Sequence, residues 1–254
     1  MKRAFFHFSP ELYAFLPAAR RRDTFEYTFK GPQSVKHLVE AAGVPHTEVS
    51  ALRINGNPAA IDSQVQEGDQ VEVLSFLEGQ VTRVLSENGE NTAPRFILDN
   101  HLGKLANYLR MLGFDSLYKN NFQDEVLAQL SVAENRVLLT RDHRLLMRKT
   151  VTQGYWLRSQ HPNQQLQEVL NRYVLADLIK PFQRCMRCNG ELVPVLKEAI
   201  LDRLQPLTIR YFNEFRICSS CSQIYWQGSH YIKMLTFIEQ ILHDPSTDFL
   251  YTNS

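Results

Sequence analysis

Residues 95–113 read RFILDNHLGKLANYLRMLG. The first part of this stretch, Phe96 to Leu98, is a short apolar run of the kind found in strands that are buried on both faces. The second part places leucines at helical spacing, and Gly113 is suited to end the helix. These leucines are Leu102, Leu105, Leu109 and Leu112. A buried strand followed by an amphipathic helix predicts one β-α unit of a parallel α/β sheet.

The same strand and helix order recurs three more times along the chain. Strands are expected over residues 115–119, 136–140 and 155–158, and helices over residues 123–133, 142–149 and 162–173. Four β-α units predict a parallel sheet with helices on both faces, in which functional residues gather at the C-terminal ends of the strands.

Acidic residues stand where these strands end or where the next helix begins. Asp99 follows the first strand, Asp142 lies two residues beyond the third, and Asp124 and Glu125 open the second helix. The first and third strands of a parallel sheet can be neighbours, so these acids are candidates for one site that binds Mg²⁺ or Mn²⁺, which prefer carboxylate oxygens. As an alternative, Asp124 and Asp142 are suited to cap helix N-termini.

Basic and aromatic side chains near these acids are candidates for binding a polyanion. Lys104 and Arg110 are expected on the helix face opposite the leucines, and Arg141 precedes Asp142; a solvated surface is the alternative. Tyr155 and Trp156 are read as buried strand aromatics, with stacking on bases as the alternative.

The charge of the chain is uneven. Residues 95–180 carry 12 Lys and Arg against 8 Asp and Glu, a net charge of +4. Residues 1–94 have a net charge of −3, from 9 basic and 12 acidic residues, and residues 181–254 are neutral. The basic middle segment fits a unit that handles nucleic acid.

The four cysteines form two pairs, Cys185-Met-Arg-Cys188 and Cys218-Ser-Ser-Cys221, with 29 residues between them. Two such pairs suit one tetrahedral Zn²⁺ bound by four thiolates, in a zinc ribbon. Four thiolates leave no open coordination position, so this zinc is expected to be structural.

The N-terminal segment has the element order of a β-grasp domain. Residues 2–8 and 24–29 alternate as strands around a charged turn at residues 20–22, Ser34 and Gly43 bracket a helix, and strands are expected over 51–54 and 71–74. This order resembles the ubiquitin-like sulfur carriers of molybdopterin and thiamine synthesis. Those carriers end in a free Gly-Gly tail, whereas this chain continues beyond Gly79, so docking to a protein partner is expected instead of sulfur transfer.

The expected organisation is a ubiquitin-like domain at residues 1–78, a linker at 79–94, an α/β core at 95–180, and a zinc ribbon with a C-terminal helix at 181–254. The apolar runs are too short to span a membrane. The first residues lack the pattern of a signal peptide, so a cytoplasmic protein is expected.

Taken together, residues 95–113, Leu138-Leu139-Thr140-Arg141-Asp142, Arg158-Ser159, both cysteine pairs and Tyr225-Trp226-x-Gly228-Ser229-His230 resemble the Mut-seven-type C-terminal RNase domain. That family is PIN-like, and its bacterial members often carry a ubiquitin-like domain in front. The resemblance implies a Mg²⁺- or Mn²⁺-dependent ribonuclease, expected to be endonucleolytic, whose metal-binding acids are Asp99, Asp124 and Asp142 with Glu125 as a helper.

The chain departs from the PIN pattern in one respect. PIN nucleases commonly use a fourth acid after the next strand, yet no Asp or Glu lies between Asp142 and Glu168. One-metal catalysis or weakened activity therefore stays open. Two alternatives also stay open: a non-catalytic RNA- or ribosome-binding adaptor that uses the zinc ribbon and basic core, and a protein related to the sulfur carriers.

Overall fold

A computed structural model describes residues 1–21, 24–76 and 93–242. The chain forms two compact units, Met1–Arg83 with Gln123–Leu157, and Val84–Phe122 with Arg158–Ser254. Most of the predicted linker, residues 79–94, lies outside the described residues. In the part of the chain that the structure describes, no helix combines the length and apolar character that crossing a membrane requires.

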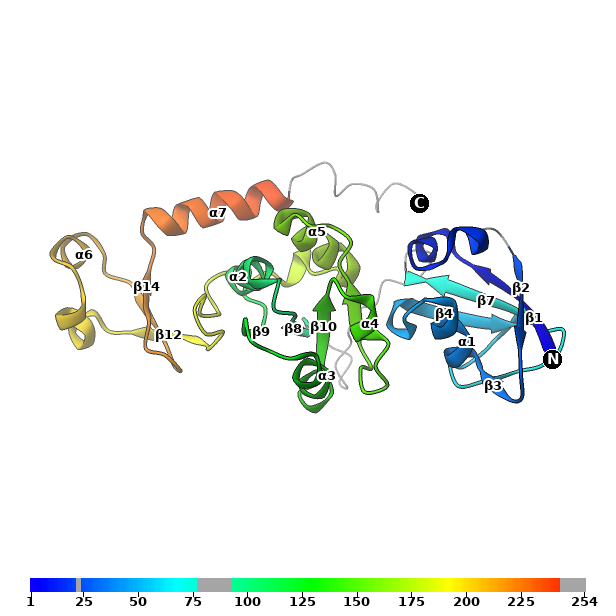
Figure 1. The fold of residues 1–254 in the computed structure, drawn as a ribbon. Coiled ribbons are helices and arrows are strands. Elements are labelled where there is room, and N and C mark those ends of the chain that lie inside the picture. The colour runs from blue at the N-terminus through cyan, green and yellow to red at the C-terminus, as the bar shows by residue number, and fades with distance from the viewer. Residues whose placement is uncertain (22–23, 77–92, 243–254) are drawn as a thin grey trace. The chain divides into compact units, whose positions relative to one another are not determined.

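The N-terminal part of the first unit is a five-stranded mixed sheet in the order β2-β1-β7-β4-β5, with helix α1 beside it (Figure 1). Strand β1 pairs in parallel with β7 and antiparallel with β2, as in a β-grasp fold. A short antiparallel pair, β3 and β6, lies outside this sheet. The elements are β1 (Lys2–Phe8), η1 (Pro10–Phe15), η2 (Ala18–Arg20), β2 (Phe25–Phe29), β3 (Gln33–Ser34), α1 (Val35–Ala42), η3 (His46–Glu48), β4 (Val49–Ile54), β5 (Asn57–Pro58), β6 (Gln64–Val65) and β7 (Gln70–Ser75).

Helix α1 begins and ends where the sequence predicts. The Ser34 hydroxyl accepts a hydrogen bond from the His37 N–H at 3.3 Å, which satisfies one of the free donors at the helix start. Gly43 ends the helix with φ 114°, and a Cβ there would lie 2.6 Å from the carbonyl oxygen of Phe15. Glycine is therefore required at residue 43 by both its backbone conformation and its surroundings.

The connection between β1 and β2 differs from the expected charged turn. It is longer and contains two 3-10 helices, η1 and η2, and Leu12 and Leu16 from this segment are buried in the hydrophobic core of the module. These two leucines gain burial by folding back onto the sheet, which a tight hairpin turn would not allow.

The first unit also contains a parallel strand pair. Strand β10 pairs in parallel with β11, with Leu138 opposite Gly154 and Thr140 opposite Trp156, and all five residues of β10 are buried. Helix α4 is shorter than predicted, because its last turn tightens into hydrogen bonds between residues three apart, such as Arg148 N–H to the Leu145 carbonyl at 3.4 Å. The elements are α3 (Asp124–Ala133), β10 (Arg136–Thr140), α4 (His143–Leu146) and β11 (Gly154–Trp156).

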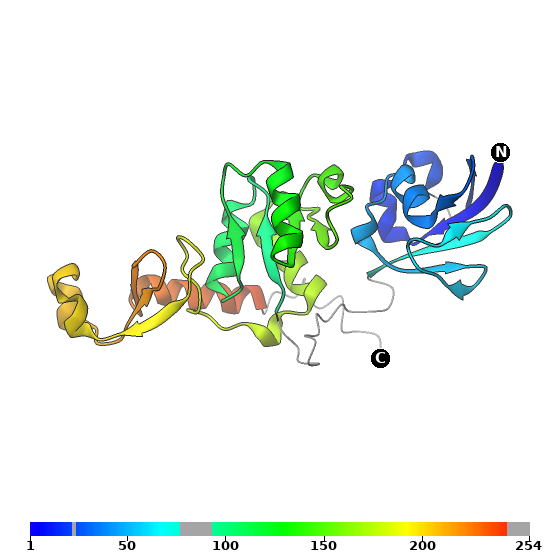
Figure 2. The ribbon, with the colours of Figure 1, turned by 90° about the horizontal axis from the view of Figure 1, so that it is seen from below.

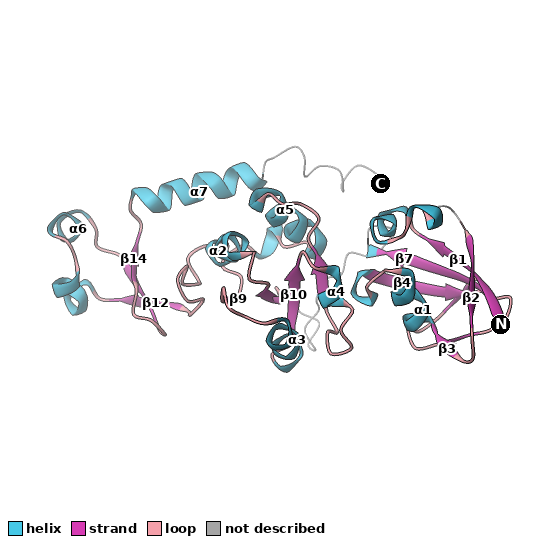
Figure 3. Ribbon diagram, in the orientation of Figure 1, coloured by secondary structure: helices cyan, strands magenta, loops and turns pink. Residues whose placement is uncertain are grey.

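The second unit holds another parallel strand pair, β8 and β9, and a separate antiparallel sheet in the order β12-β13-β14. Figure 2 shows helix α7 leading away from β14, and Figure 3 shows helical turns in the connection between β12 and β13. The elements are β8 (Arg95–Leu98), α2 (Gly103–Met111), β9 (Ser116–Tyr118), α5 (Pro162–Tyr173), η5 (Ala176–Leu178), β12 (Leu192–Val195), η6 (Lys197–Arg203), α6 (Pro206–Tyr211), β13 (Phe215–Cys218), β14 (Ile224–Trp226) and α7 (Ser229–Leu242). The predicted fold class, a β-grasp domain with a parallel α/β core and a cysteine-bearing C-terminal part, is confirmed.

The leucine stripe on α2 is buried as predicted, with all four leucines at most 2% exposed. The helix ends at Met111, and Gly113, two residues beyond it, has φ 97°. A Cβ at Gly113 would lie 2.1 Å from the carbonyl oxygen of Lys180, and the N–H of Lys180 donates to the Leu112 carbonyl at 3.0 Å. The end of α2 is therefore packed directly against the backbone that leads into the cysteine-bearing region.

We predict that Gly113→Ala lowers the free energy of unfolding by about 3 kcal/mol, because it combines left-handed backbone strain with a backbone clash. Gly68→Ala is the matched control, since Gly68 has φ 83° but nothing within 4 Å of a Cβ. The control should lose about 1 kcal/mol. Urea unfolding followed by circular dichroism measures both, and equal losses would contradict the packing described for Gly113.

Candidate functional site

The four cysteines come together in the second unit. Their sulfur atoms all lie within 4.8 Å of one another, with Cys185 to Cys221 at 3.6 Å and Cys188 to Cys218 at 3.4 Å. Sulfurs around a tetrahedral zinc, with bonds of about 2.3 Å, would lie about 3.8 Å apart. Across residues 1–21, 24–76 and 93–242, no other group of three or more His, Cys, Asp or Glu side chains has metal-binding spacing.

The backbone around the second cysteine pair favours thiolate at Cys218. The N–H groups of Ser220 and Cys221 point at Cys218 Sγ from 3.4 and 3.5 Å. Burial alone would raise the pKa of the Cys218 thiol, but these N–H groups, together with hydrogen bonds from the Cys188 and Cys221 side chains, outweigh burial and lower the pKa to about 7. Thiolate is the form that binds metal, so the cluster fits a four-coordinate metal ion.

Two further residues shape the cysteine cluster. A Cβ at Gly190 would lie 2.8 Å from Cys218 Sγ and 2.6 Å from Ser220 Oγ, so the two pairs can approach only because residue 190 is glycine. The Tyr225 hydroxyl lies 3.0 Å from Cys185 Sγ. Burial and the neighbouring sulfur raise the pKa of Tyr225, so its hydroxyl keeps its proton and can donate to the thiolate.

Arg110 and Asn189 connect this cluster to the α/β core, and neither connection was predicted. Arg110 Nε donates to the Ser116 carbonyl at 2.9 Å, and Nη1 donates to the Met186 carbonyl, between the first two cysteines, at 3.2 Å. The Asn189 side chain accepts from the Ser116 N–H at 2.8 Å and donates to Asp115 Oδ1 at 2.8 Å. The first cysteine turn is thus hydrogen-bonded to both ends of the α2–β9 connection.

The expectation that Arg110 lies on an exposed, phosphate-binding face is therefore wrong. Arg110 is only 4% exposed. Burial lowers the pKa of its guanidinium, although the negative charges of Cys185, Cys188 and Asp115 act to raise it. Lys104, on the same helix, is exposed as expected, with Nζ 5.8 Å from the Tyr108 ring centroid.

Asp142 is exposed and caps helix α4, as the capping alternative predicted. Its Oδ1 accepts from the Arg144 N–H at 2.9 Å, and its own N–H donates to Thr140 Oγ1 at 2.9 Å. The other carboxylate oxygen, Oδ2, has no hydrogen-bond partner among the residues that the structure describes. This oxygen is the one that a cation could use.

Asp124 does not cap α3, contrary to the capping alternative. The cap position is Gln123, and Asp124 is the first residue of the helix. Asp124 and Glu125 are both exposed and both pair with Arg148, at 3.8 and 2.5 Å. The charges of the acids at the start of α3 are therefore partly neutralised by Arg148.

Asp99 directly follows β8, as predicted, and its Oδ1 accepts from the Asn100 N–H at 2.6 Å. Asp99 belongs to the second compact unit, whereas Asp124, Glu125 and Asp142 belong to the first. Convergence of these acids on one cation stays a prediction.

The aromatic residues at the end of β11 are placed differently from each other. Tyr155 is buried, as expected for a strand aromatic. Trp156 is half-buried, and its Nε1 donates to the Arg141 carbonyl at 3.0 Å. The Arg141 side chain is exposed.

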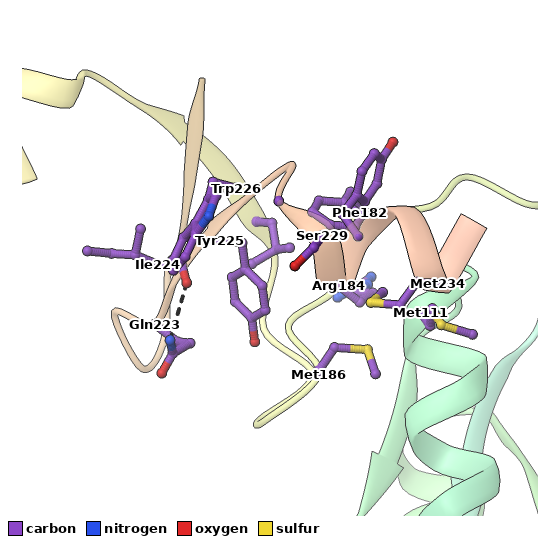
Figure 4. Close-up of a pocket in the computed structure, with 13 residues that line it drawn as sticks. Met111, Phe182, Arg184, Met186, Gln223, Ile224, Tyr225, Trp226, Ser229 and Met234 are labelled. Atoms are coloured by element: carbon purple, nitrogen blue, oxygen red, sulfur yellow. Dashed lines mark hydrogen bonds between the residues drawn. The ribbon is translucent and has the colours of Figure 1, made fainter. Parts of the chain in front are cut away.

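A cavity of about 340 Å³ lies beside the cysteine turns (Figure 4). Figure 4 shows Met111, Met186 and Met234 on one side of it and Tyr225 on the other, with Arg184 among them. No pattern in the sequence indicates this cavity, because its lining residues come from separate segments that include α2, the first cysteine turn, β14 and α7.

The family model described as Mut7-C RNAse domain matches residues 94–238, more than half of the chain. The chain belongs to this family. A second model, Mut7-C ubiquitin, matches residues 1–80 of this Mut7-C protein, so both parts of the predicted resemblance are confirmed.

Two solved structures match the chain, both of small archaeal modifier protein 1 from Haloferax volcanii. They are 16% and 15% identical, cover 30% and 31% of this chain and 98% and 99% of their own, and have TM-scores of 0.24 and 0.25. No curated protein matches the chain.

We predict that Arg110→Ala lowers the free energy of unfolding by about 2 to 3 kcal/mol, because it leaves buried carbonyl groups without donors. Lys104→Ala, one turn and a half earlier on the same helix, should change it by less than about 0.5 kcal/mol. Denaturant unfolding of both variants tests this difference. If Arg110→Ala left the free energy of unfolding unchanged, the guanidinium would not be needed as a donor to these buried carbonyl groups.

Proposed function

We propose that this Mut7-C protein is a metal-dependent ribonuclease that hydrolyses internal phosphodiester bonds of RNA. The observation that carries the proposal is the Mut7-C RNAse match over residues 94–238, which by itself supports a nuclease-like role at family level. The matched segment includes all four candidate acids and all four cysteines.

The proposed cation ligands are Asp99, Asp124 and Asp142, with Glu125 as a helper. Their donors are carboxylate oxygens, which suit Mg²⁺ or Mn²⁺. A bound cation would activate a water and stabilise charge on the departing oxygen. The Asp142 carboxylate suits this role, because its capping hydrogen bond fixes Oδ1 and leaves Oδ2 available to a cation.

The missing fourth acid favours a single cation. Glu168 is the next acid after Asp142, and its two oxygens accept from the Ser159 and Arg158 N–H groups at 2.8 and 2.9 Å. This carboxylate holds the backbone before α5, so it does not replace the fourth acid. We infer a one-metal arrangement, with the exposed side chains of Lys104 and Arg141 contacting the RNA backbone.

The pairing of Arg148 with Asp124 and Glu125 favours a second candidate function. If this ion pair persists in solution, these acids are neutralised and the chain acts as a non-catalytic RNA-binding adaptor. A cleavage assay separates the two functions.

We predict that the purified protein cleaves single-stranded or structured RNA in the presence of Mn²⁺ or Mg²⁺. Asp99→Asn and Asp142→Asn should each reduce cleavage by about 100-fold or more, since each removes a charged ligand. Asp177→Asn, at an exposed acid in η5, is the control and should cleave as the wild type does. Wild-type cleavage no faster than that of Asp142→Asn would reject the nuclease and leave the adaptor.

We also propose that the cysteine cluster holds one structural Zn²⁺ and that the protein works in the cytoplasm. The sulfur spacing and the N–H groups around Cys218 support the metal. Four free thiols for metal binding persist most readily in a reducing compartment, which supports the location.

Metal analysis of the purified chain is expected to give about one zinc per chain, as a four-thiolate site requires. The double variant Cys185→Ser with Cys188→Ser should lose this zinc. A wild-type protein that is metal-free and fully folded would reject the zinc site.

A further inference from the structure

The ubiquitin-like module contacts the RNase part of the first unit through an aromatic cluster. The Phe15 ring, at the end of η1, lies 4.8 Å from the Trp156 ring and 6.3 Å from the His143 ring, measured between centroids. His143 and Trp156 lie 6.5 Å apart with their rings nearly perpendicular. Phe15 thus packs onto two residues that are far from it in sequence.

Hydrogen bonds of Glu48 and His46 flank this cluster. Glu48, which is 3% exposed, accepts from the Trp156 N–H through Oε1 at 2.7 Å. His46 Nε2 lies 2.8 Å from the carbonyl oxygen of Val151, and His46 Nδ1 lies 2.7 Å from Glu40 Oε1. Both ring nitrogens of His46 therefore lie within hydrogen-bonding distance of an oxygen. Separating the buried Glu48 carboxylate from the Trp156 N–H would break this hydrogen bond, which costs free energy. This cost makes the contact specific.

The contact reaches the residues on either side of Asp142. Trp156 Nε1 donates to the carbonyl of Arg141, immediately before Asp142. His143, immediately after Asp142, is the first residue of α4 and part of the aromatic cluster. The module therefore supports the turn formed by residues 141–143 through Trp156 on one side and His143 on the other.

We propose that the ubiquitin-like module positions the Asp142 turn of its own chain, with Phe15 and Glu48 as the positioning residues. In this role, the partner of this face of the module is the RNase domain of the same chain. The contact itself does not depend on the catalytic assignment, whereas its effect on cleavage rests on the proposed ribonuclease function.

The contact is measured directly with Trp156 as a probe. The chain has two tryptophans, so Trp226→Phe leaves Trp156 as the only one. In this background, Phe15→Ala is expected to shift Trp156 emission to the red and to increase its quenching by acrylamide. Phe5→Ala, at a ring 39% exposed on β1 of the same module, is the matched control and should change neither.

Phe15 also packs against the core of the module, so a second variant separates lost contact from lost folding. Glu48→Ala removes the acceptor of the Trp156 N–H and is outside that hydrophobic core. It should shift Trp156 emission in the same direction. The circular dichroism spectrum of each variant confirms that the module is folded.

Positioning is measured by hydrogen exchange and by metal dependence. Amides of residues 141–148 should exchange faster in Phe15→Ala and Glu48→Ala than in Phe5→Ala. In the cleavage assay, the Mn²⁺ concentration for half-maximal rate should rise by about ten-fold in the first two variants, with the KM for RNA unchanged.

Each outcome decides a different statement. Unchanged Trp156 emission in both variants would overturn the contact. A red shift with unchanged exchange at residues 141–148 would overturn the positioning role. If no variant and no wild-type protein cleaves RNA, the ribonuclease function fails, and the emission and exchange results still decide whether the module positions the turn.

Discussion

The second unit depends on the burial of one guanidinium. Arg110 stays charged at any physiological pH, and a buried cation needs acceptors for its N–H groups. The carbonyl of Ser116 supplies one acceptor, and the carbonyl of Met186 supplies another. The start of β9, the end of α2 and the first cysteine turn must therefore form together, and Gly113 provides the close approach that this requires at Lys180. The cysteine region is consequently an integral part of this half of the molecule.

Local patterns in the sequence were sufficient to predict features that lie within a single helix, a single strand or the cysteine pairs. Ser34 and Gly43 define α1 because capping and left-handed backbone are properties of single residues and their neighbours. The leucines of α2 and the apolar run of β10 identify buried faces because their spacing matches the period of the element. The cysteine spacing predicts the cluster because two pairs of thiols have few arrangements that suit a metal.

Features that depend on contacts between distant segments escaped prediction. Arg110 appears at a polar position of α2, and only the carbonyl of Met186, 76 residues away in sequence, explains why it is buried. Leu12 and Leu16 lie in a segment whose arginines suggested a simple turn, but burial of the leucines outweighs this local signal. The sequence also did not show that Arg148 would pair with Asp124 and Glu125. The acids themselves were correctly placed at the ends of their elements, whereas their convergence, inferred from neighbouring parallel strands and from the family resemblance, stays a prediction.

The contact around Trp156 includes an aromatic cluster and hydrogen bonds of Glu48 and His46. Two separate proteins that met through these groups would lose translational and rotational freedom on association, which costs free energy. Both surfaces here belong to one chain, and a tether of this kind gives an effective concentration on the order of millimolar. Covalent fusion thus lowers the binding free energy that this contact must supply to stay formed.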